Sequence, residues 1–195
     1  MKFVQPIRCQ KKIEDLRKYL FSNPRNHLLF IIGISSAYRV SDLIQLKFNH
    51  VIDEDCNVRD YFQIRESKNH KVSRILIHPN VKDIIREYVS SHFNGNLDEY
   101  LFRSREGDNK PISRVTAYRI LKGAADAVGI DDVGTHSLRK TFAYHFFKNT
   151  GDIATLQNAL NHDSQADTLR YIGVEHDKID EAIESYSIIS KSLLI

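Results

Sequence analysis

Six polar side chains, spread over most of the chain, could together cleave a phosphodiester bond. They supply one phenol, two guanidiniums, two imidazoles and one ammonium, from Tyr171, Arg39, Arg139, His136, His162 and Lys68. A phenol is a weak nucleophile because its pKa in water is about 10. It becomes useful only where cations stabilise the phenolate and the transition state. The chemistry therefore depends on whether the fold brings these groups together.

The run His136-Ser-Leu-Arg139 could form an anion site at the start of a helix. Residues three apart lie on one helix face, a helix N-terminus favours an anion, and an arginine fork suits phosphate. The alternative is a capping histidine followed by a solvated surface arginine. For this spacing taken alone, that alternative is favoured by about three to one, because such pairs arise often by chance.

The other candidate residues also have two interpretations when each is taken alone. Arg39 follows a long apolar segment, so it needs a partner, which could be Asp42 or a bound phosphate. Lys68 lies in a basic loop that could be merely solvated or could fold over a nucleic acid. A tyrosine such as Tyr171, on a largely apolar helix, is usually a packing residue.

Charge is segregated along the chain, although the formal net charge is only +3. Basic residues gather around residues 65–74 and 103–122, and acidic residues gather in residues 175–184. This pattern favours a polyanion-binding face more than the net charge does. We expect nucleic-acid contacts from basic residues in these two regions, namely Arg65, Lys71, Arg74, Arg114 and Arg119.

The composition excludes several classes of protein. The 195 residues are 42% hydrophobic, which is enough for one substantial core and argues against disorder. Cys9 and Cys56 are far apart and lack metal-site spacing, so a disulfide scaffold or zinc site is not expected, and a reducing cytoplasm fits. The first residues lack the apolar segment of a signal peptide, and the longest apolar run, residues 28–34, is too short to span a bilayer.

Hydrophobic periodicity and capping residues predict one α+β domain, mainly helical with a small antiparallel sheet. Strands are expected over residues 58–65 and 74–77, around a polar loop, with a short strand or an extended segment at residues 100–102. Ser41-Asp42, Ser113, Asp152 and either Asp163 or Ser164 are expected to cap helices. Asn161 is expected to end a helix in the left-handed conformation. The helices are expected at residues 10–22, 25–37, 80–92, 114–129, 136–149, 152–160 and 175–190, with a short one after Ser41 and another carrying Tyr171.

Four blocks of sequence, in order, resemble the signature of the tyrosine recombinases, the phage integrase family. Ser36-Ala-Tyr-Arg39-Val-Ser-Asp-Leu43 resembles T-G-L-R-x-S-E-L, and Lys68 resembles the family's β-hairpin lysine. Residues 136–143, His-Ser-Leu-Arg-Lys-Thr-Phe-Ala, resemble H-x-L-R-H-T-F-A. Leu160-Asn-His162, followed nine residues later by Tyr171, resembles L-G-H-x(8)-Y. Each block alone is a weak signal, but four in register form a specific one.

The resemblance implies the fold of a tyrosine recombinase catalytic domain and a role for each residue. Tyr171 would attack the scissile phosphate to form a 3′-phosphotyrosyl link, while Arg39 and Arg139 hold the non-bridging oxygens. Lys68 would protonate the leaving 5′-oxygen, His136 would accept the tyrosine proton, and His162 would donate a hydrogen bond to the phosphate. The reaction would need no metal and no cofactor.

The resemblance also implies partners. These are double-stranded DNA and further copies of the chain, monomeric when free and assembled on paired recombination sites, as a tetramer. The segment from residue 175 to 190 carries an apolar stripe of Ile179, Ile183, Tyr186 and Ile189. That stripe could pack on its own domain or dock on a neighbouring copy.

The sequence departs from the family pattern at several positions. Asn161 replaces a glycine, Gly173 stands where a second histidine is common, and Lys68 lacks flanking glycines, which leaves Lys71 as an alternative general acid. Some 38 residues precede Arg39, whereas family members usually carry an N-terminal core-binding domain that closes around DNA. The chain is therefore an excised catalytic domain or a naturally short member, and its initial methionine favours the second.

Two other functions fit part of the sequence. Residues 152–172 could form a helix-turn-helix in a non-catalytic DNA-binding protein. That interpretation leaves Arg39 and the His136–Arg139 pair unexplained. A type IB topoisomerase is the other alternative, because it shares the active-site chemistry. Covalent trapping on nicked DNA would separate both enzymes from a simple DNA-binding protein.

Overall fold

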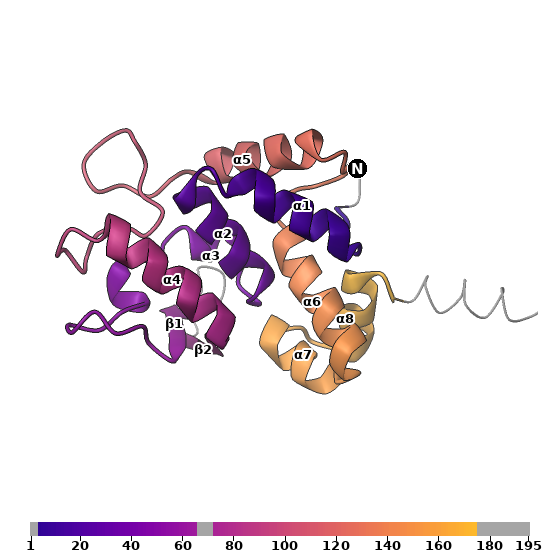
Figure 1. Ribbon diagram of the computed structural model, residues 1–195. Coiled ribbons are helices and arrows are strands. Elements are labelled where there is room, and N and C mark those ends of the chain that lie inside the picture. The colour runs from indigo at the N-terminus through magenta and orange to yellow at the C-terminus, as the bar shows by residue number, and fades with distance from the viewer. Residues whose placement is uncertain (1–3, 66–71, 175–195) are drawn as a thin grey trace, which may run out of the picture.

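The computed structural model describes residues 4–65 and 72–174 (Figure 1). Over these residues the chain is mostly helical, with one small antiparallel sheet, as the sequence predicts. Lys68, Lys71 and the predicted helix over residues 175–190 lie outside the described residues. No helix in the described ranges is long and apolar enough to cross a membrane.

The first two helices meet at a single Asn-Pro pair. Helix α1 spans Gln10–Leu20 and α2 spans Pro24–Ile34. The side chain of Asn23 accepts a hydrogen bond from the backbone of Asn26, and Pro24 occupies the first turn of α2, where its fixed φ and missing N–H are tolerated. Asn23 and Pro24 therefore define the start of α2, shortly after α1 ends at Leu20.

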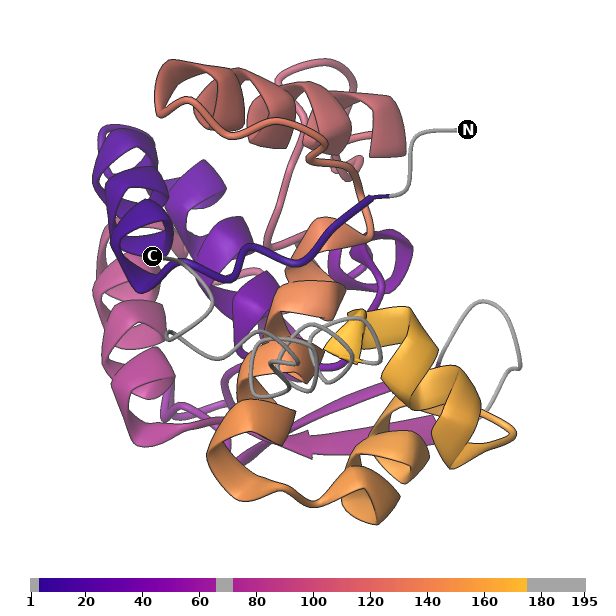
Figure 2. The ribbon, with the colours of Figure 1, turned by 90° about the vertical axis from the view of Figure 1, so that its right-hand side faces the viewer.

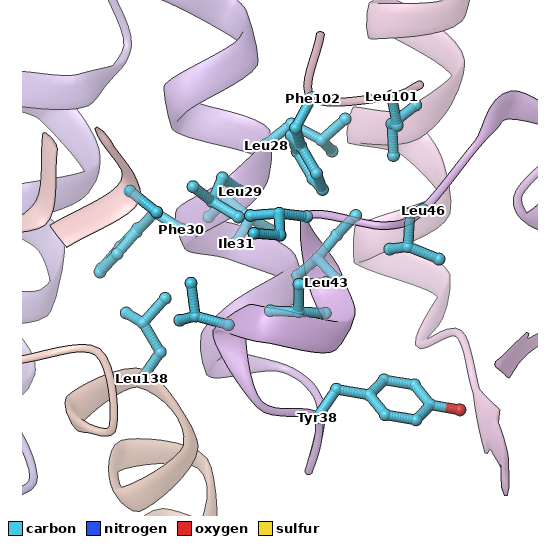
Figure 3. Packing of buried hydrophobic residues seen from close by; sticks show 14 of the residues in the cluster. Leu28, Leu29, Phe30, Ile31, Tyr38, Leu43, Leu46, Leu101, Phe102 and Leu138 are labelled. Carbon is cyan, nitrogen blue, oxygen red and sulfur yellow. The ribbon is translucent and has the colours of Figure 1, made fainter. Parts of the chain in front are cut away.

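Helix α2 is the centre of the larger hydrophobic core. Its middle is buried on nearly every side, with Leu28, Leu29 and Phe30 fully inaccessible to solvent. Figure 3 shows these side chains packed among residues from other parts of the chain, including Leu43, Phe102 and Leu138. Burying apolar surface stabilises a fold by about 25 cal/mol per Å². This burial holds the apolar α2 in the centre of the core.

The short helix that follows begins earlier than its predicted caps. Helix α3 spans Val40–Leu43, so Ser41 and Asp42 lie within it rather than at its N-cap position. Arg39 is the N-cap residue, with extended backbone and no side-chain capping bond. The prediction of Ser41-Asp42 as caps is therefore wrong, because burial of Val40 and Leu43 fixes the start of this helix rather than a polar side chain. A 3-10 helix, η1, follows at Phe48–His50.

The sheet is a single hairpin among the described residues. Strands β1 (Tyr61–Arg65) and β2 (Val72–Leu76) pair antiparallel, with Tyr61 opposite Leu76 and Gln63 opposite Arg74. β1 starts later than predicted because Val58 pairs with Ile52 in an isolated bridge instead. β2 starts two residues earlier than predicted. Residues 100–102 form no strand; Tyr100 pairs with Lys47 in another isolated bridge.

Helices α4 (Pro79–His92) and α5 (Arg114–Ala127) begin at local capping interactions. His78 and Ser113 each accept a hydrogen bond from the backbone two or three residues ahead. The predicted role of Ser113 is confirmed. Figure 1 shows α5 at the edge of the molecule beside α1, which agrees with the contacts between these two helices.

The last three described helices form the C-terminal side of the molecule. Helices α6 (Ser137–Thr150), α7 (Ile153–Leu160) and α8 (Gln165–Ile172) follow one another through short turns. Asp152 caps α7, and Asn161 ends it with φ of 50°, both as predicted. Ser164, rather than Asp163, caps α8.

Helix α6 joins the two hydrophobic clusters of the molecule. It contacts α2 on one side and both α7 and α8 on the other. Figure 2 shows α6 running through the middle, with the indigo and purple helices on one side and yellow α8 on the other. Leu138 belongs to the larger cluster and Ala143 to the smaller one. Gly33 of α2 lies so close to Leu138 that a Cβ atom would not fit between the helices.

Candidate active site

Arg139 is a buried cation at the start of α6. Its side chain is 3% exposed, and Nη2 donates a hydrogen bond of 2.7 Å to the carbonyl of Leu160. That carbonyl lies in the last turn of α7, whose end has no intrahelical donors for its last carbonyls. Arg139 thus ties α6 to the loop that carries His162. The alternative interpretation of Arg139 as a solvated surface residue is wrong.

His136 stands immediately before α6, with an exposed side chain that makes no capping bond. Desolvation lowers the pKa of its imidazole below the ordinary value of 6.5, and the charges of Arg139, Arg39 and Lys140 lower it further. The ring is therefore neutral near pH 7 and can accept a proton. His136 does occupy the N-cap position of α6, as the alternative interpretation has it, but its side chain makes no capping hydrogen bond.

Arg39 and His136 line one groove, although they are far apart in sequence. The groove has a volume of about 700 Å³ and lies where the segments before α3, α5 and α6 meet. Ser113 and Arg114, at the start of α5, line the same groove. It is open to solvent and is lined by two cations, Arg39 and Arg114, so it can receive an extended anionic ligand.

His162 is held in place by the turn between α7 and α8. Asn161 turns the chain out of α7, and His162 Nδ1 lies 3.1 Å from Thr168 Oγ1 on α8. Desolvation lowers the pKa of this imidazole, Arg139 and Arg39 lower it further, and Asp167 and Asp163 partly oppose them. The Thr168 hydroxyl also donates to the Ser164 carbonyl. Because that hydroxyl proton goes to the carbonyl, His162 donates from Nδ1 to Thr168, and its Nε2 is an acceptor in the neutral ring.

Tyr171 projects from α8 towards these groups. Its ring centroid lies 5.0 Å from that of His162, and the two rings are nearly perpendicular at 80°. Its hydroxyl is buried and has no hydrogen-bond partner among the described residues. Desolvation raises the pKa of the phenol, while the charges of Arg139 and Arg39 act to lower it. The phenol is therefore neutral, and the two cations that act on it could stabilise its anion.

The guanidiniums of Arg39 and Arg139 lower the pKa values of both histidines and act to lower that of Tyr171. Arg39 and Arg139 act electrostatically on His136, His162 and Tyr171, so the fold gathers these five side chains in one neighbourhood. They come from the start of α3, the start of α6, the turn after α7 and the end of α8. A tyrosine beside two arginines and two histidines can attack a phosphate that the cations hold.

The remaining predicted residues are more scattered. Lys68 and Lys71 lie outside the described residues, and so does the side chain of Arg65. The predicted DNA contacts that are described are all exposed. Arg114 lines the groove with Arg39, Arg119 lies further along α5, and Arg74 stacks on the Tyr61 ring at 3.5 Å from its centroid.

Two residues near the tyrosine had no predicted role. Thr168 is fully buried and is the partner of His162. The ammonium of Lys140 lies over the Tyr171 ring, 4.9 Å from its centroid. The position of Lys140, directly after Arg139 in the third sequence block, was the only signal in the sequence that could have drawn attention to it.

This arrangement of helices is the catalytic-domain fold of the tyrosine recombinases. The chain superposes on XerA recombinase with a TM-score of 0.72 at 22% identity, covering 88% of this chain and 60% of that one. Its TM-score with XerH, solved in a post-cleavage complex with its palindromic difH substrate, is 0.70 at 18% identity, over 93% of this chain and 53% of that one. The catalytic domain of bacteriophage HP1 integrase matches with a TM-score of 0.58 at 20% identity, covering 92% of this chain and 94% of that domain.

The profile of the phage integrase family matches residues 10–178, and the chain belongs to that family. It is 46% identical over 178 residues to the probable integrase/recombinase YoeC of Bacillus subtilis strain 168, covering 91% of this chain and 93% of YoeC. It is 29% identical to the tyrosine recombinase XerH of Campylobacter jejuni, over 92% of this chain. The match spans only 52% of XerH.

Proposed function

We propose that this protein is a site-specific DNA recombinase that breaks and rejoins strands through a covalent link to Tyr171. The observation that carries the proposal is the buried Tyr171 hydroxyl, held within the electrostatic reach of Arg39 and Arg139. Membership of the integrase family and the 46% identity to an integrase/recombinase support the same reaction. A non-catalytic DNA-binding protein would need none of these groups.

In the first step, Tyr171 Oη attacks the scissile phosphorus. A bond forms between Oη and the phosphorus, the bond to the 5′-oxygen breaks, and the 3′ end stays attached to the protein. The phenolic proton passes to His136, which is neutral near pH 7 because desolvation and nearby cations lower its pKa. The leaving 5′-oxygen takes a proton from Lys68, or from Lys71 if that lysine is the general acid.

The two arginines stabilise the transition state of this step. Charge develops on the non-bridging oxygens as the phosphorus becomes pentacoordinate, and fixed guanidiniums are suited to that charge. Arg139 needs little reorganisation because it is already fixed by the Leu160 carbonyl. His162 adds a hydrogen bond to the phosphate when Nε2 is protonated, because its Nδ1–H is already donated to Thr168, and an anion in the site favours that imidazolium form. The protein's own cations provide the charge in this mechanism, so no metal ion is required.

In the second step, the 5′-hydroxyl of a partner strand attacks the phosphotyrosine. This reverses the first step and releases Tyr171, so the number of phosphodiester bonds is unchanged and no nucleotide is consumed. Exchange between two duplexes needs several protomers, and we propose a tetramer on paired sites formed from free monomers. A solved λ integrase tetramer bound to a Holliday junction, similar in fold at a TM-score of 0.66, supports such an assembly. A cytoplasmic location stays a prediction from the sequence.

A nicked suicide substrate tests the enzymatic part of the proposal. Cleavage near a nick releases a short oligonucleotide, so the 5′-hydroxyl diffuses away and the covalent complex accumulates. We expect a protein–DNA adduct that survives denaturation and forms equally well in a chelator. Absence of an adduct on DNA that contains the protein's own recombination site would contradict the proposal.

Strand exchange separates a recombinase from a topoisomerase. The recombinase should join strands from two duplexes that carry the site, whereas a topoisomerase should relax supercoiled plasmids without exchange. Relaxation of any plasmid, with no recombinant product from paired sites, would favour the topoisomerase instead.

A further inference from the structure

Lys140 is a partly buried cation on α6 that no step of the proposed reaction uses. Its ammonium lies over the face of the Tyr171 ring, 4.9 Å from the centroid. A cation at this distance from an aromatic face is attracted by the negative potential of the ring. The attraction is stronger where water is excluded, and Lys140 is less than half exposed.

The position of the nucleophile depends strongly on contacts to its ring. The Tyr171 hydroxyl makes no hydrogen bond among the described residues, so no such bond fixes its rotamer. The ring instead contacts the imidazole of His162 and packs against the smaller hydrophobic cluster around Leu160 and Ile172. Apolar packing is non-directional. The contacts with Lys140 and His162 depend on the orientation of the Tyr171 ring, so they restrict that orientation.

Lys140 lies on a well-packed helix, so its ammonium can hold the Tyr171 ring in a defined position. It follows Arg139 in α6, a helix of 14 residues that packs between two hydrophobic clusters. Tyr171 lies two residues before the left-handed Gly173, where α8 ends. The contact therefore joins the nucleophile, near the end of a short helix, to the same rigid element that holds a phosphate-binding arginine.

We infer that Lys140 is a positioning residue, which holds the ring of Tyr171 beside His162 through the cation–π contact. The inference rests on the proposed function, since it concerns the nucleophile of that reaction. Removal of the ammonium should let the ring sample other rotamers. The fraction of protein with Tyr171 ready to attack should then fall, while the groove that binds DNA is unchanged.

The test measures DNA binding and cleavage separately. Lys140→Met keeps the length and apolar stem of the side chain but removes the charge, and Lys140→Arg keeps a cation that can lie over the ring. With protein in excess over a suicide substrate, we expect Lys140→Met to lower the rate of covalent-complex formation by roughly 2- to 30-fold, the range of one cation–π contact. Its dissociation constant for DNA should be unchanged, and Lys140→Arg should recover most of the rate.

The same helix offers a matched control. Lys148 lies over the ring of Tyr144, 5.9 Å from the centroid, on an exposed part of α6. Lys148→Met removes a similar contact from a tyrosine that has no part in the reaction, so it should cleave at the wild-type rate. Thermal unfolding of both variants shows whether either one is folded, and Lys140→Gln provides a second neutral substitution.

A measurement on the free protein separates this inference from the proposed function. Iodination of tyrosines, followed by peptide mass spectrometry, should modify Tyr171 faster in Lys140→Met than in the wild type, with exposed Tyr118 as the internal reference. Equal iodination and equal cleavage would overturn the positioning role, and so would a fall in cleavage fully explained by weaker DNA binding. Failure of the wild-type protein to form any adduct would overturn the proposed function but leave the iodination result meaningful.

Discussion

At the scale of single residues, the site combines a buried phenol with buried or partly buried cations. Desolvation raises the pKa of Tyr171, so the phenol is protonated near pH 7 in the free protein. Arg139 and Arg39 oppose that shift. A phosphate that enters the groove would be drawn by the same guanidiniums that favour the phenolate, so binding and activation share one source of charge.

Arg139 should therefore be required for both chemistry and local stability. We expect Arg139→Ala to slow cleavage by at least about 100-fold, because a fixed donor to the transition state is lost. The Leu160 carbonyl also loses its donor, which should cost about 1–3 kcal/mol in the free energy of unfolding. Suicide-substrate kinetics and urea unfolding measure the two effects.

The control for this prediction is an arginine with no such contacts. Arg86 is exposed on α4 and pairs only with Asp83 among the described residues. Arg86→Ala should leave cleavage unchanged and alter stability by less than about 0.5 kcal/mol. A cleavage rate in Arg139→Ala close to that of Arg86→Ala would contradict the role given to Arg139.

His27, which lies in the core rather than the candidate active site, should make the stability of the protein depend on pH. It is 7% exposed, its Nε2 has no hydrogen-bond partner in the described chain, and it contacts the Phe21 ring edge-on. Burial lowers its pKa below the ordinary value of 6.5, Arg17 lowers it further, and Glu87 acts in the opposite sense. The folded protein thus binds a proton at this site less readily than the unfolded chain does.

The sign of the pH effect follows from this difference. Above pH 6.5 both states hold a neutral imidazole, and the protein has its full stability. As pH falls below 6.5 towards the lowered pKa, the unfolded chain gains the proton first, so the free energy of unfolding decreases. We expect His27→Leu to show a smaller decrease in urea unfolding between pH 7.5 and pH 5, and an equal decrease in both proteins would contradict this account.

The active site was predictable residue by residue only in part. The types and order of Arg39, His136, Arg139, His162 and Tyr171 were visible in the sequence, because four blocks resemble one family. Their convergence was implied only by that resemblance, since spacing along the chain says nothing about contacts between residues a hundred positions apart. The contact of Lys140 with Tyr171 depends on how α6 and α8 pack, and no local pattern encodes it.

At the scale of elements, the close packing of α2 on α6 sets the geometry of the site. Gly33 is the point of closest approach, because a Cβ atom there would overlap the side chain of Leu138. α6 carries Arg139 one residue further on, and α2 leads into the segment that carries Arg39. A change in the spacing of these two helices should therefore move the two guanidiniums relative to one another.

Two glycine-to-alanine substitutions, one at this helix contact and one away from it, should have opposite effects on stability. We expect Gly33→Ala to destabilise the protein by about 1–3 kcal/mol, because Leu138 is buried and the core resists overpacking. Gly123 lies within α5 with open space where a Cβ atom would lie, so Gly123→Ala should stabilise the protein by about 0.5–1 kcal/mol through helix propensity. Thermal or urea unfolding measures both, and a stabilising Gly33→Ala would show that the helices can separate freely.

Helix ends were predictable where a side chain or a special backbone conformation defines them. Ser113, Asp152 and Asn161 each do what their chemistry favours. The start of α3 was not predictable, because burial of Val40 outweighs the capping preferences of Ser41 and Asp42. The start of β1 was also missed, since β propensity at Val58 does not reveal that its partner is Ile52.

At the scale of the whole molecule, the groove with Arg39 at its edge extends to the start of α5. Arg114 lies on that groove and is exposed, so it can contact a phosphate away from the scissile one. DNA binding should weaken with added salt, because each phosphate contact releases a counterion. We expect Arg114→Ala to reduce the slope of log K against log salt concentration by about 1.

The control for the salt prediction is a lysine that does not line the groove. Lys18 is exposed on α1 and approaches only Glu14 among the ion pairs of the described residues. Lys18→Ala should leave the salt slope of the wild-type protein unchanged. Equal slopes for Arg114→Ala and the wild type in a fluorescence-anisotropy titration would remove Arg114 from the DNA interface.

The central claim is that Tyr171 is the nucleophile that becomes joined to DNA. The most direct measurement compares the wild-type protein with Tyr171→Phe on a nicked suicide substrate, with the adduct quantified on a denaturing gel and its DNA-linked peptide identified by mass spectrometry. The account predicts equal DNA affinity for both proteins, an adduct for the wild type at Tyr171, and none for Tyr171→Phe. A covalent adduct formed by Tyr171→Phe, or one mapped to another residue, would contradict it.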